Sequence, residues 1–225
     1  PEEVVSTSCG TESDNWAIRA ACWQNRHTGR HIVTTAVEHH AVLNCCQQLE
    51  QEGWEVTRIL PDRNGDISTE AVLAAVRPDT ALVSVMMVNN ELGNIYPIAD
   101  IARGLKAVND KTLLHTDAVQ GFLKVPFSAK TLGADFITIS GHKVGGPKGI
   151  GALYVRRKPR VRIEPQIHGG GHERGMRSGT LATHQIVGMG EAYRLALLEA
   201  DKDREHAEKL SKRLLDGILK NIPDV

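Results

Sequence analysis

The stretch DFITISGHKVGGPKGIGALYV, residues 135–155, places a glycine-rich turn between two short runs of apolar and β-branched residues. Runs of this kind, bounded by Gly and Pro, are typical of β-strands. His142 and Lys143 follow directly after the first run, where glycines let the backbone approach a ligand closely. The stretch therefore predicts two strands of one sheet, with a lysine at the end of the first.

Strand-like and helix-like patterns alternate in the sequence before this stretch. We predict strands at 3–8, 31–36, 55–60, 80–88 and 112–117, and helices at 12–25, 41–53, 68–76 and 97–108. Strands separated by helices favour right-handed crossovers and a mostly parallel sheet covered on both faces. The run TALVSVMMV at 80–88 is typical of a strand buried on both sides. We therefore predict a three-layer αβα fold over residues 1–183.

Residues 184–225 depart from this alternation. From His184 to Asn221, apolar residues recur at helical spacing among charged ones, which predicts one long amphipathic helix or two in succession. We expect this segment to lead out of the sheet domain. Because the sequence opens within a predicted strand and stops as the helix gives way to Pro223, we also expect it to be part of a longer chain.

The composition of the 225 residues disfavours several classes of function. Lysine plus arginine and aspartate plus glutamate number 27 each, so no net charge draws the chain to nucleic acid or to an anionic membrane. No apolar run approaches the ~20 residues that span a bilayer. The cysteines at 9, 22, 45 and 46 form no CxxC pair, which favours a soluble protein in the cytoplasm or another reducing compartment.

Three local patterns invite other interpretations, which we disfavour. The segment GHKVGGPKG lacks the Gly-Lys-Ser/Thr ending of a nucleotide P-loop. His168 and His172 have the spacing of zinc ligands, but the glycines between them are incompatible with a rigid helix, so no metal site is predicted. The basic run RRKPRVR at 156–162 is interpreted as a solvated face rather than as a contact for RNA or an acidic partner.

Polar residues follow five of the predicted strands at the point where each strand ends. In an open α/β sheet, ligands bind at the edge where the carboxyl ends of the strands meet. The residues concerned are Gly10, Thr11, Glu38, His39, His40, Asn89, Asn90, Glu91, Asp117, Gln120, Ser140, His142 and Lys143. Together they predict a polar crevice at that edge.

One end of this crevice is suited to a phosphate group. Gly10 and Thr11 open a predicted helix, whose first N–H groups favour an anion. We expect Thr11 to cap the helix and to contact the ligand. Ser140 and His142 can add hydrogen bonds to the same phosphate.

The other end is suited to an aromatic aldehyde. A buried Asp117 requires a cationic partner, and a protonated pyridine nitrogen is one such partner. His39 can lie on the face of an aromatic ring, and the amine of Lys143 can bind an aldehyde. Phosphate, pyridinium, ring face and aldehyde together specify pyridoxal phosphate.

Six segments of the chain, taken in order, resemble the cysteine desulfurases among the fold-type I, class V aminotransferase-like enzymes. The segments are SCGTESDNWAI, EHHAVLNCC, VNNELGNIYPI, HTDAVQ, SGHKVGGPKGIGALYVRR and HGGGHERGMRSGTL. They cover nearly the whole chain. The resemblance implies the large, cofactor-binding domain of a pyridoxal-phosphate transferase over residues 1–183, without the N-terminal segment and most of the small domain, toward which residues 184–225 lead.

The resemblance implies a role for each matching residue. The implied catalytic residues are Lys143, which binds the cofactor aldehyde and moves the substrate's α-proton, Asp117 at the ring nitrogen, and His39 on the ring face. The remaining implied cofactor ligands are Gly10, Thr11, Ser140 and His142 at the phosphate, Gln120 at the ring oxygen, Asn90 near the substrate, and Thr180 from a neighbouring subunit. A role for Thr180 across an interface implies a homodimer.

The implied reaction converts L-cysteine to L-alanine and passes the sulfur to an enzyme cysteine as a persulfide. Sulfur-acceptor proteins or iron–sulfur scaffold proteins are the implied partners. The nucleophilic cysteine of the family lies well downstream of the lysine, whereas no cysteine follows Cys46 here. A selenocysteine lyase, another class V lyase or aminotransferase, and a cofactor-binding scaffold without turnover therefore stay open as alternatives.

Two local departures from the family pattern affect the predicted site. Cys9-Gly10 stands where the family usually shows Gly-Ala, and Val144-Gly145-Gly146 where a tyrosine commonly precedes the glycine. Both departures leave cofactor binding intact as an expectation, but they change the packing around the phosphate and the lysine.

Overall fold

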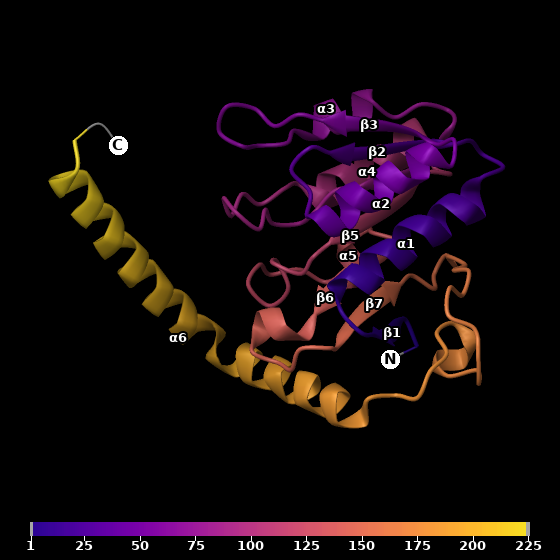
Figure 1. Ribbon diagram of the computed structural model, residues 1–225. Helices are drawn as coiled ribbons and strands as arrows, with labels where there is room; N and C mark the ends of the chain where they lie inside the picture. Colours follow the sequence, from indigo (N-terminus) through magenta and orange to yellow (C-terminus); the bar gives the residue numbers. More distant parts are fainter. Residues whose placement is uncertain (1, 224–225) are drawn as a thin grey trace.

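A computed structural model describes residues 2–223 of the chain, and a seven-stranded sheet lies at its centre (Figure 1). The strands are β1 (Val4–Thr7), β2 (His31–Thr35), β3 (Glu55–Ile59), β4 (Thr80–Ser84), β5 (Leu113–Asp117), β6 (Phe136–Ser140) and β7 (Gly151–Val155). They lie in the order β1-β7-β6-β5-β4-β2-β3. All pairs from β3 to β6 are parallel, whereas β7 is antiparallel to both β6 and β1. Since β7 runs opposite to β6 and β1 runs opposite to β7, β1 points in the same direction as the parallel strands and ends at the same edge.

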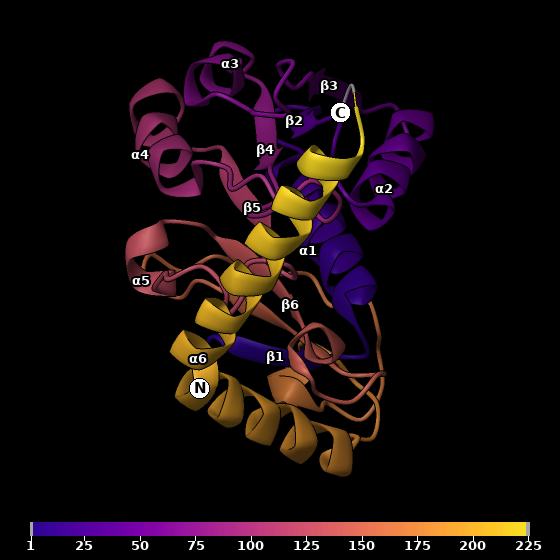
Figure 2. The same ribbon diagram turned by 90° about the vertical axis from the view of Figure 1, so that its left-hand side faces the viewer.

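Helices cover both faces of the sheet (Figures 1 and 2). One face carries α1 (Gly10–Asn25) and α2 (His40–Gln51), and the other carries α3 (Thr69–Ala74), α4 (Ile98–Val108) and α5 (Ala129–Leu132). Neighbouring strand residues such as Ile32 and Val33 belong to opposite cores, since side chains alternate along a strand. The predicted α/β fold with a mostly parallel central sheet is confirmed.

The predicted strand at 80–88 is too long by its last residues, because β4 ends at Ser84. The N–H groups of Val85 and Met87 still donate to the carbonyls of His115 and Asp117 at 3.2 and 2.8 Å. Met87 in turn accepts a hydrogen bond from the N–H of Tyr96 at 2.9 Å, so the chain has left the regular ladder. Val85, Met86 and Met87 are all buried, which explains why this turn has the apolar composition of a strand.

The C-terminal segment is one helix, α6 (Thr183–Asn221), of 39 residues. Its first turns pack on the sheet, where Ile186, Met189 and Tyr193 contact Ile150 and Ala152. Beyond these turns α6 runs away from the sheet (Figures 1 and 2) and exposes Leu198, Leu214 and other apolar side chains. The division of the chain into residues 1–183 and 184–225 stays a prediction. Within residues 2–223, none of the helices has the length and apolar character needed to cross a bilayer.

Candidate active site

The carboxyl edge of the sheet contains a cavity of about 250 Å³. Its walls come from the start of α1, the start of α2, the turn after β4, the end of β5, and the short 3-10 helix η1 (Gly141–Val144) that follows β6. The lining residues are Cys9, Gly10, Thr11, Asp14, His39, Met86, Asn90, Asp117, Val119, Gln120, Ser140, His142 and Lys143. The structure thus brings together every residue to which the resemblance gives a cofactor role except Thr180, which lies exposed in the loop before α6. Four further residues predicted for the crevice, Glu38, His40, Asn89 and Glu91, do not line it.

The start of α1 forms one end of the cavity. The first intrahelical hydrogen bond runs from the N–H of Ser13 to the carbonyl of Cys9 at 3.2 Å, so the N–H groups of Gly10 and Thr11 precede it. A Cβ at residue 10 would lie 3.0 Å from Val119, so glycine gives the tight approach that this wall needs. Unpaired N–H groups and the helix dipole make this end suited to an anion.

The prediction that Thr11 caps α1 is wrong. The helix begins at Gly10 with Cys9 as its N-cap residue, and no side chain caps it. Thr11 therefore lies inside the first turn, where its own N–H is one of the groups without an intrahelical acceptor. The hydroxyl of Ser13 instead bonds with Thr7 at 2.7 Å and donates to the Cys9 carbonyl at 3.3 Å.

Ser140 and His142 face the cavity from β6 and η1. The Ser140 hydroxyl lies 2.9 Å from Nδ1 of His142, so each side chain orients the other. Burial lowers the pKa of His142, and the charges of Lys143 and Lys148 lower it further. A neutral imidazole and a serine hydroxyl can each donate a hydrogen bond. Both side chains can therefore contribute to binding an anion that lies at the start of α1.

Lys143 is fixed by the geometry of η1. A Cβ at Gly141 would lie 2.9 Å from Ile150, so the backbone of the turn packs directly against the start of β7. Gly145 ends the turn with a φ of 80°, a conformation that favours glycine over the tyrosine common in the family. Burial lowers the pKa of Lys124, which does not line the cavity, and the nearby Lys143 lowers it further.

Asp117 ends β5 and is buried against the cavity wall. One carboxylate oxygen accepts a hydrogen bond from the N–H of Val119 at 2.9 Å. Burial, and to a smaller extent the neighbouring Asp14, raise the pKa of Asp117 to about 7. A raised pKa means that ionising Asp117 costs free energy in the folded chain. A cation placed in the cavity would offset this cost, because it would stabilise the ionised carboxylate.

His39 has a structural task in addition to its place in the cavity. It is the N-cap residue of α2, and its Nδ1 accepts a hydrogen bond from the N–H of Ala41 at 3.1 Å. This bond fixes the imidazole ring relative to the helix. Gln120, which follows β5, also lines the cavity and accepts a hydrogen bond from Nζ of Lys124 at 3.2 Å.

Two of the edge residues serve the fold rather than the cavity. Glu38 is buried and accepts hydrogen bonds from the Thr35 hydroxyl at 2.8 Å and the N–H of Met86 at 2.9 Å. Asn89 is also buried and holds the turn after β4 by accepting from the N–H groups of Glu91 and Leu92. His40 and Glu91 do not line the cavity either.

Asp14 is the lining residue that sequence reasoning missed. It lies on the second turn of α1 and is 1% exposed. The apolar residues Ala17, Ile18 and Ala21 follow at helical spacing, so the sequence placed Asp14 on the buried face of the helix. That spacing was the available signal, because a carboxyl on a buried face requires an explanation.

A second, larger cavity of about 510 Å³ lies between the end of α1 and residues 157–164. Five arginines line it, among them Arg160 and Arg162 of the basic run. Arg157 is ion-paired with Glu2, and Arg174 donates to the carbonyl of Val4 at 3.0 Å. None of the predicted site residues lines this cavity, so it is separate from the chemistry described above.

The residues of the smaller cavity fit pyridoxal phosphate. The start of α1, with Ser140 and His142, supplies donors for a phosphate, and a primary amine lies in the same space. The buried Asp117, whose pKa is raised by burial, matches the positive charge of a pyridinium nitrogen. The donor set therefore agrees with the ligand that the sequence specified.

Comparison with known proteins points to one family. The family described as aminotransferase class-V matches residues 1–225. The cysteine desulfurase IscS of Vibrio vulnificus (strain YJ016) is 55% identical over 218 residues, which are 97% of this chain and 54% of that protein. The chain spans about half the length of the curated relatives it matches.

Solved structures give the same result. A NifS-like protein superimposes with a TM-score of 0.94 at 42% identity, covering 98% of this chain and 60% of the other. DndA from Streptomyces lividans superimposes with a TM-score of 0.89 at 44% identity, covering 97% and 62%. In both cases the similarity extends over almost all of this chain.

Proposed function

Because the chain belongs to the aminotransferase class V family, whose members use pyridoxal phosphate, we propose that it is the cofactor-binding part of a cysteine desulfurase. The proposed reaction releases L-alanine from L-cysteine and transfers the sulfur as a persulfide. The observation that carries the proposal is the meeting of Lys143 and Asp117, from two different segments, in one cavity with an anion-binding helix start.

Most polar residues of the cavity have a task under this proposal. The N–H groups at the start of α1, with Thr11, Ser140 and His142, bind the phosphate and so fix the position of the ring. His39 lies on the ring face, held by its cap bond to Ala41. Asn90 and Gln120 bind polar groups at the ring edge and the substrate. The bound cofactor supplies an electron sink for the substrate carbon.

Lys143 and Asp117 divide the proton chemistry between them. Asp117 as a carboxylate holds a proton on the ring nitrogen, which keeps the electron sink effective. Nζ of Lys143 binds the cofactor aldehyde in the resting protein and moves the proton at the substrate's α-carbon. The position of Lys143 on a short turn between two paired strands limits its movement to the side chain itself.

We further propose that the protein works as a homodimer in which Thr180 reaches the phosphate of the neighbouring subunit. In this chain Thr180 is exposed, and it follows Gly179, whose φ is 121°. Sulfur-acceptor or iron–sulfur scaffold proteins are the proposed partners, and the cytoplasm or another reducing compartment is the proposed location.

A cofactor-binding scaffold without turnover is a second candidate. It is favoured by one observation, namely that Cys22, Cys45 and Cys46 are buried away from the cavity. Burial raises the pKa of Cys45 and of Cys46 to about 12, which makes both thiols poor nucleophiles. Cys9 alone lines the cavity.

The visible absorption of the chain loaded with pyridoxal phosphate tests the proposal. We expect an imine band in the wild-type chain that disappears in Lys143→Ala and persists in the control Lys148→Ala, whose side chain is exposed and outside the cavity. A band that survives in Lys143→Ala would refute the assignment of the lysine.

Turnover distinguishes the enzyme from the scaffold. Incubation of the loaded chain with L-cysteine and a reductant yields sulfide and alanine if this chain is an active desulfurase. An imine band without sulfide supports the scaffold. Parallel assays with selenocysteine and with an amino-group acceptor identify a lyase or an aminotransferase of the same family.

A further inference from the structure

The cavity contains a second buried carboxyl that the proposed function does not use. Asp14 enters the cavity from α1, whereas Asp117 enters it from β5. Both side chains are buried, with exposed fractions of 1% and 5%. Two carboxyl groups that share one small buried space cannot both be ionised without a large electrostatic cost.

The two carboxyls differ in what surrounds them. Asp117 accepts a hydrogen bond from the N–H of Val119, and such a bond favours the ionised form. Oδ1 of Asp14, in contrast, has no hydrogen-bond partner within the described residues 2–223. A buried carboxylate oxygen without a hydrogen-bond donor is costly to ionise, because it loses its hydration and gains no partner in return.

The nearest basic group does not supply a positive charge to Asp14. Nε2 of His115 lies 3.5 Å from Oδ1 of Asp14, and both ring nitrogens of His115 are within bonding distance of hydroxyls, Ser84 at 2.9 Å and Thr138 at 3.0 Å. Burial lowers the pKa of His115 to about 4. The imidazole is therefore neutral at physiological pH.

Most of the other titratable groups around Asp14 favour its protonated form, Lys143 being the exception. Those on the neighbouring elements are Asp117 and His115 on β5, Glu38 and His39 after β2, Cys45 on α2, and Lys143 on η1 across the cavity. Burial raises the pKa of Asp14 to about 7 and that of Glu38 to about 8. Asp14 is thus surrounded mainly by acidic and neutral groups.

We propose that Asp14 is a second carboxyl of the cofactor site, which keeps a proton while Asp117 is ionised. The pair then presents a single negative charge to the ring nitrogen, and Asp14 acts as a positioning residue through Asp117. This inference rests on the proposed function for its link to the cofactor, but the shared proton is a property of the chain itself. Ionisation of Asp14 at higher pH adds a second negative charge beside the ring.

NMR titration of the cofactor-free chain, with isotope-labelled aspartate carboxyl carbons, tests the coupling directly. We expect Asp117→Asn to lower the titration midpoint of Asp14 by about one unit or more, the size typical of coupled sites, because Asp14 no longer ionises beside a charged carboxylate. Asp135→Asn is the matched control, because Asp135 is buried elsewhere and ion-paired with Arg156. An Asp14 midpoint that is the same in wild type and Asp117→Asn overturns the proposal.

Two further measurements keep the test decisive. If Asp117→Asn does not fold, Asp14→Asn serves in its place. We expect it to leave the midpoint of Asp117 nearly unchanged, because Asn resembles the protonated Asp14, and a lowered Asp117 midpoint overturns the proposal. In the loaded chain, the visible spectrum of the wild type should change with pH above neutrality, and Asp14→Asn should lack this change. Coupled carboxyls in a wild-type chain that shows no imine band would refute the proposed function and leave the shared proton established, whereas uncoupled carboxyls beside a normal band would refute only the inference.

Discussion

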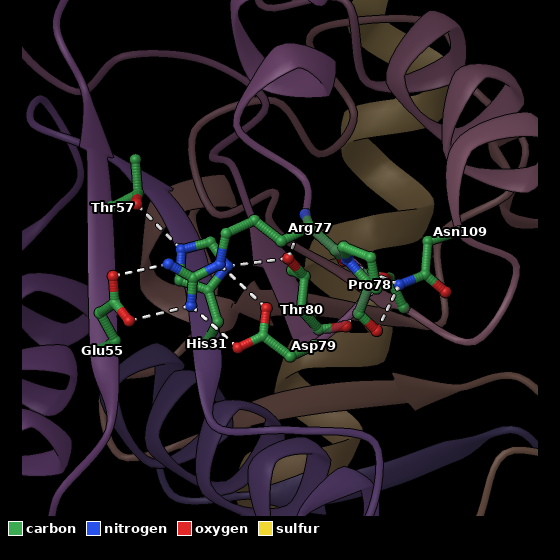
Figure 3. A network of polar contacts seen from close by, with 9 residues as sticks. His31, Glu55, Thr57, Arg77, Pro78, Asp79, Thr80 and Asn109 are labelled. Atoms are coloured by element: carbon green, nitrogen blue, oxygen red, sulfur yellow. Dashed lines mark hydrogen bonds and ion pairs between the residues drawn. The ribbon is translucent and has the colours of Figure 1, made fainter.

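The hydrogen bonding of buried polar groups differs between the two edges of the sheet. At the carboxyl edge, Asp14 and Asp117 are buried around a cavity, and one Asp14 oxygen has no partner within the part of the chain that the structure describes. At the amino edge, the polar groups bond to each other (Figure 3). His31 there has Thr80 at 2.8 Å on one ring nitrogen and Thr57 at 2.9 Å on the other.

The amino edge continues as a closed network around Arg77. Its guanidinium donates two hydrogen bonds to Glu55, at 2.6 and 2.9 Å, and two to Asp79, both at 2.9 Å. The backbone N–H of Arg77 donates to the Thr80 hydroxyl at 2.7 Å, and its backbone carbonyl accepts from the Asn109 side-chain amide at 3.0 Å (Figure 3). Both edges are rich in charge, so charge alone does not identify a site. A partnerless polar group that also lines a cavity, as Asp14 does, is more informative, because a ligand in that cavity can satisfy it.

The largest expected effect concerns Asp117 and pH. The folded-state pKa of about 7 lies above the ordinary value of 3.8, so the stability contributed by this group is full below about pH 4 and is lost as the pH rises through 7. Asp117→Asn removes this titration and keeps an acceptor for the N–H of Val119. Above pH 7 we expect the cofactor-free variant to be more stable than wild type by up to roughly 4 kcal/mol. Urea unfolding of both proteins across this pH range measures the difference, and a difference independent of pH would contradict it.

The next effect tests the closed network at the amino edge. Thr80→Val leaves Nδ1 of the buried His31 and the N–H of Arg77 without their partner, which should destabilise the fold by about 2 kcal/mol. Thr116→Val is the matched control, because the Thr116 hydroxyl is buried with no partner among residues 2–223. We expect this control to be neutral or stabilising in thermal unfolding. Equal losses in the two variants would remove the distinction between the edges.

The smallest effect concerns the exposed ion pairs of the same network. Arg77→Gln breaks contacts with Glu55 and Asp79, whose side chains are 67% and 48% exposed. Pairs of this kind contribute little and are screened by salt. The loss of stability should be smaller than for Thr80→Val and should vanish at ~1 M salt. A large loss that persists at high salt would show that the arginine acts through packing instead.

The sequence predicted the layers and the shared edge because both depend on periodicity and on where strands end. Gly10, His39, Asp117 and Lys143 are separated by long stretches of sequence, yet the rule that parallel strands end together placed them in one crevice. What the sequence could not supply is the state of each hydrogen-bonding group. Asp14 and His31 are both buried polar residues, and only the coordinates distinguish the orphaned group from the paired one.

The local errors have the same origin. Thr11 failed as a cap because helix starts vary by a residue or two, and the hydroxyl of Ser13 bonds the backbone there instead. The strand at 80–88 was predicted too long because a buried turn has the same composition as a buried strand. Neither error moved a residue out of the cavity.

The pairing of β1 with β7 has a consequence for how the protein is made. Val5 lies opposite Leu153 in that pair, so among residues 2–223 the strand that leads into α1 gains its sheet neighbour only when residues 151–155 have left the ribosome. Long-range closures of this kind slow folding. The anion-binding end of the cavity is therefore completed late during synthesis, and a nascent chain halted before residue 151 would expose the apolar side chain of Val5.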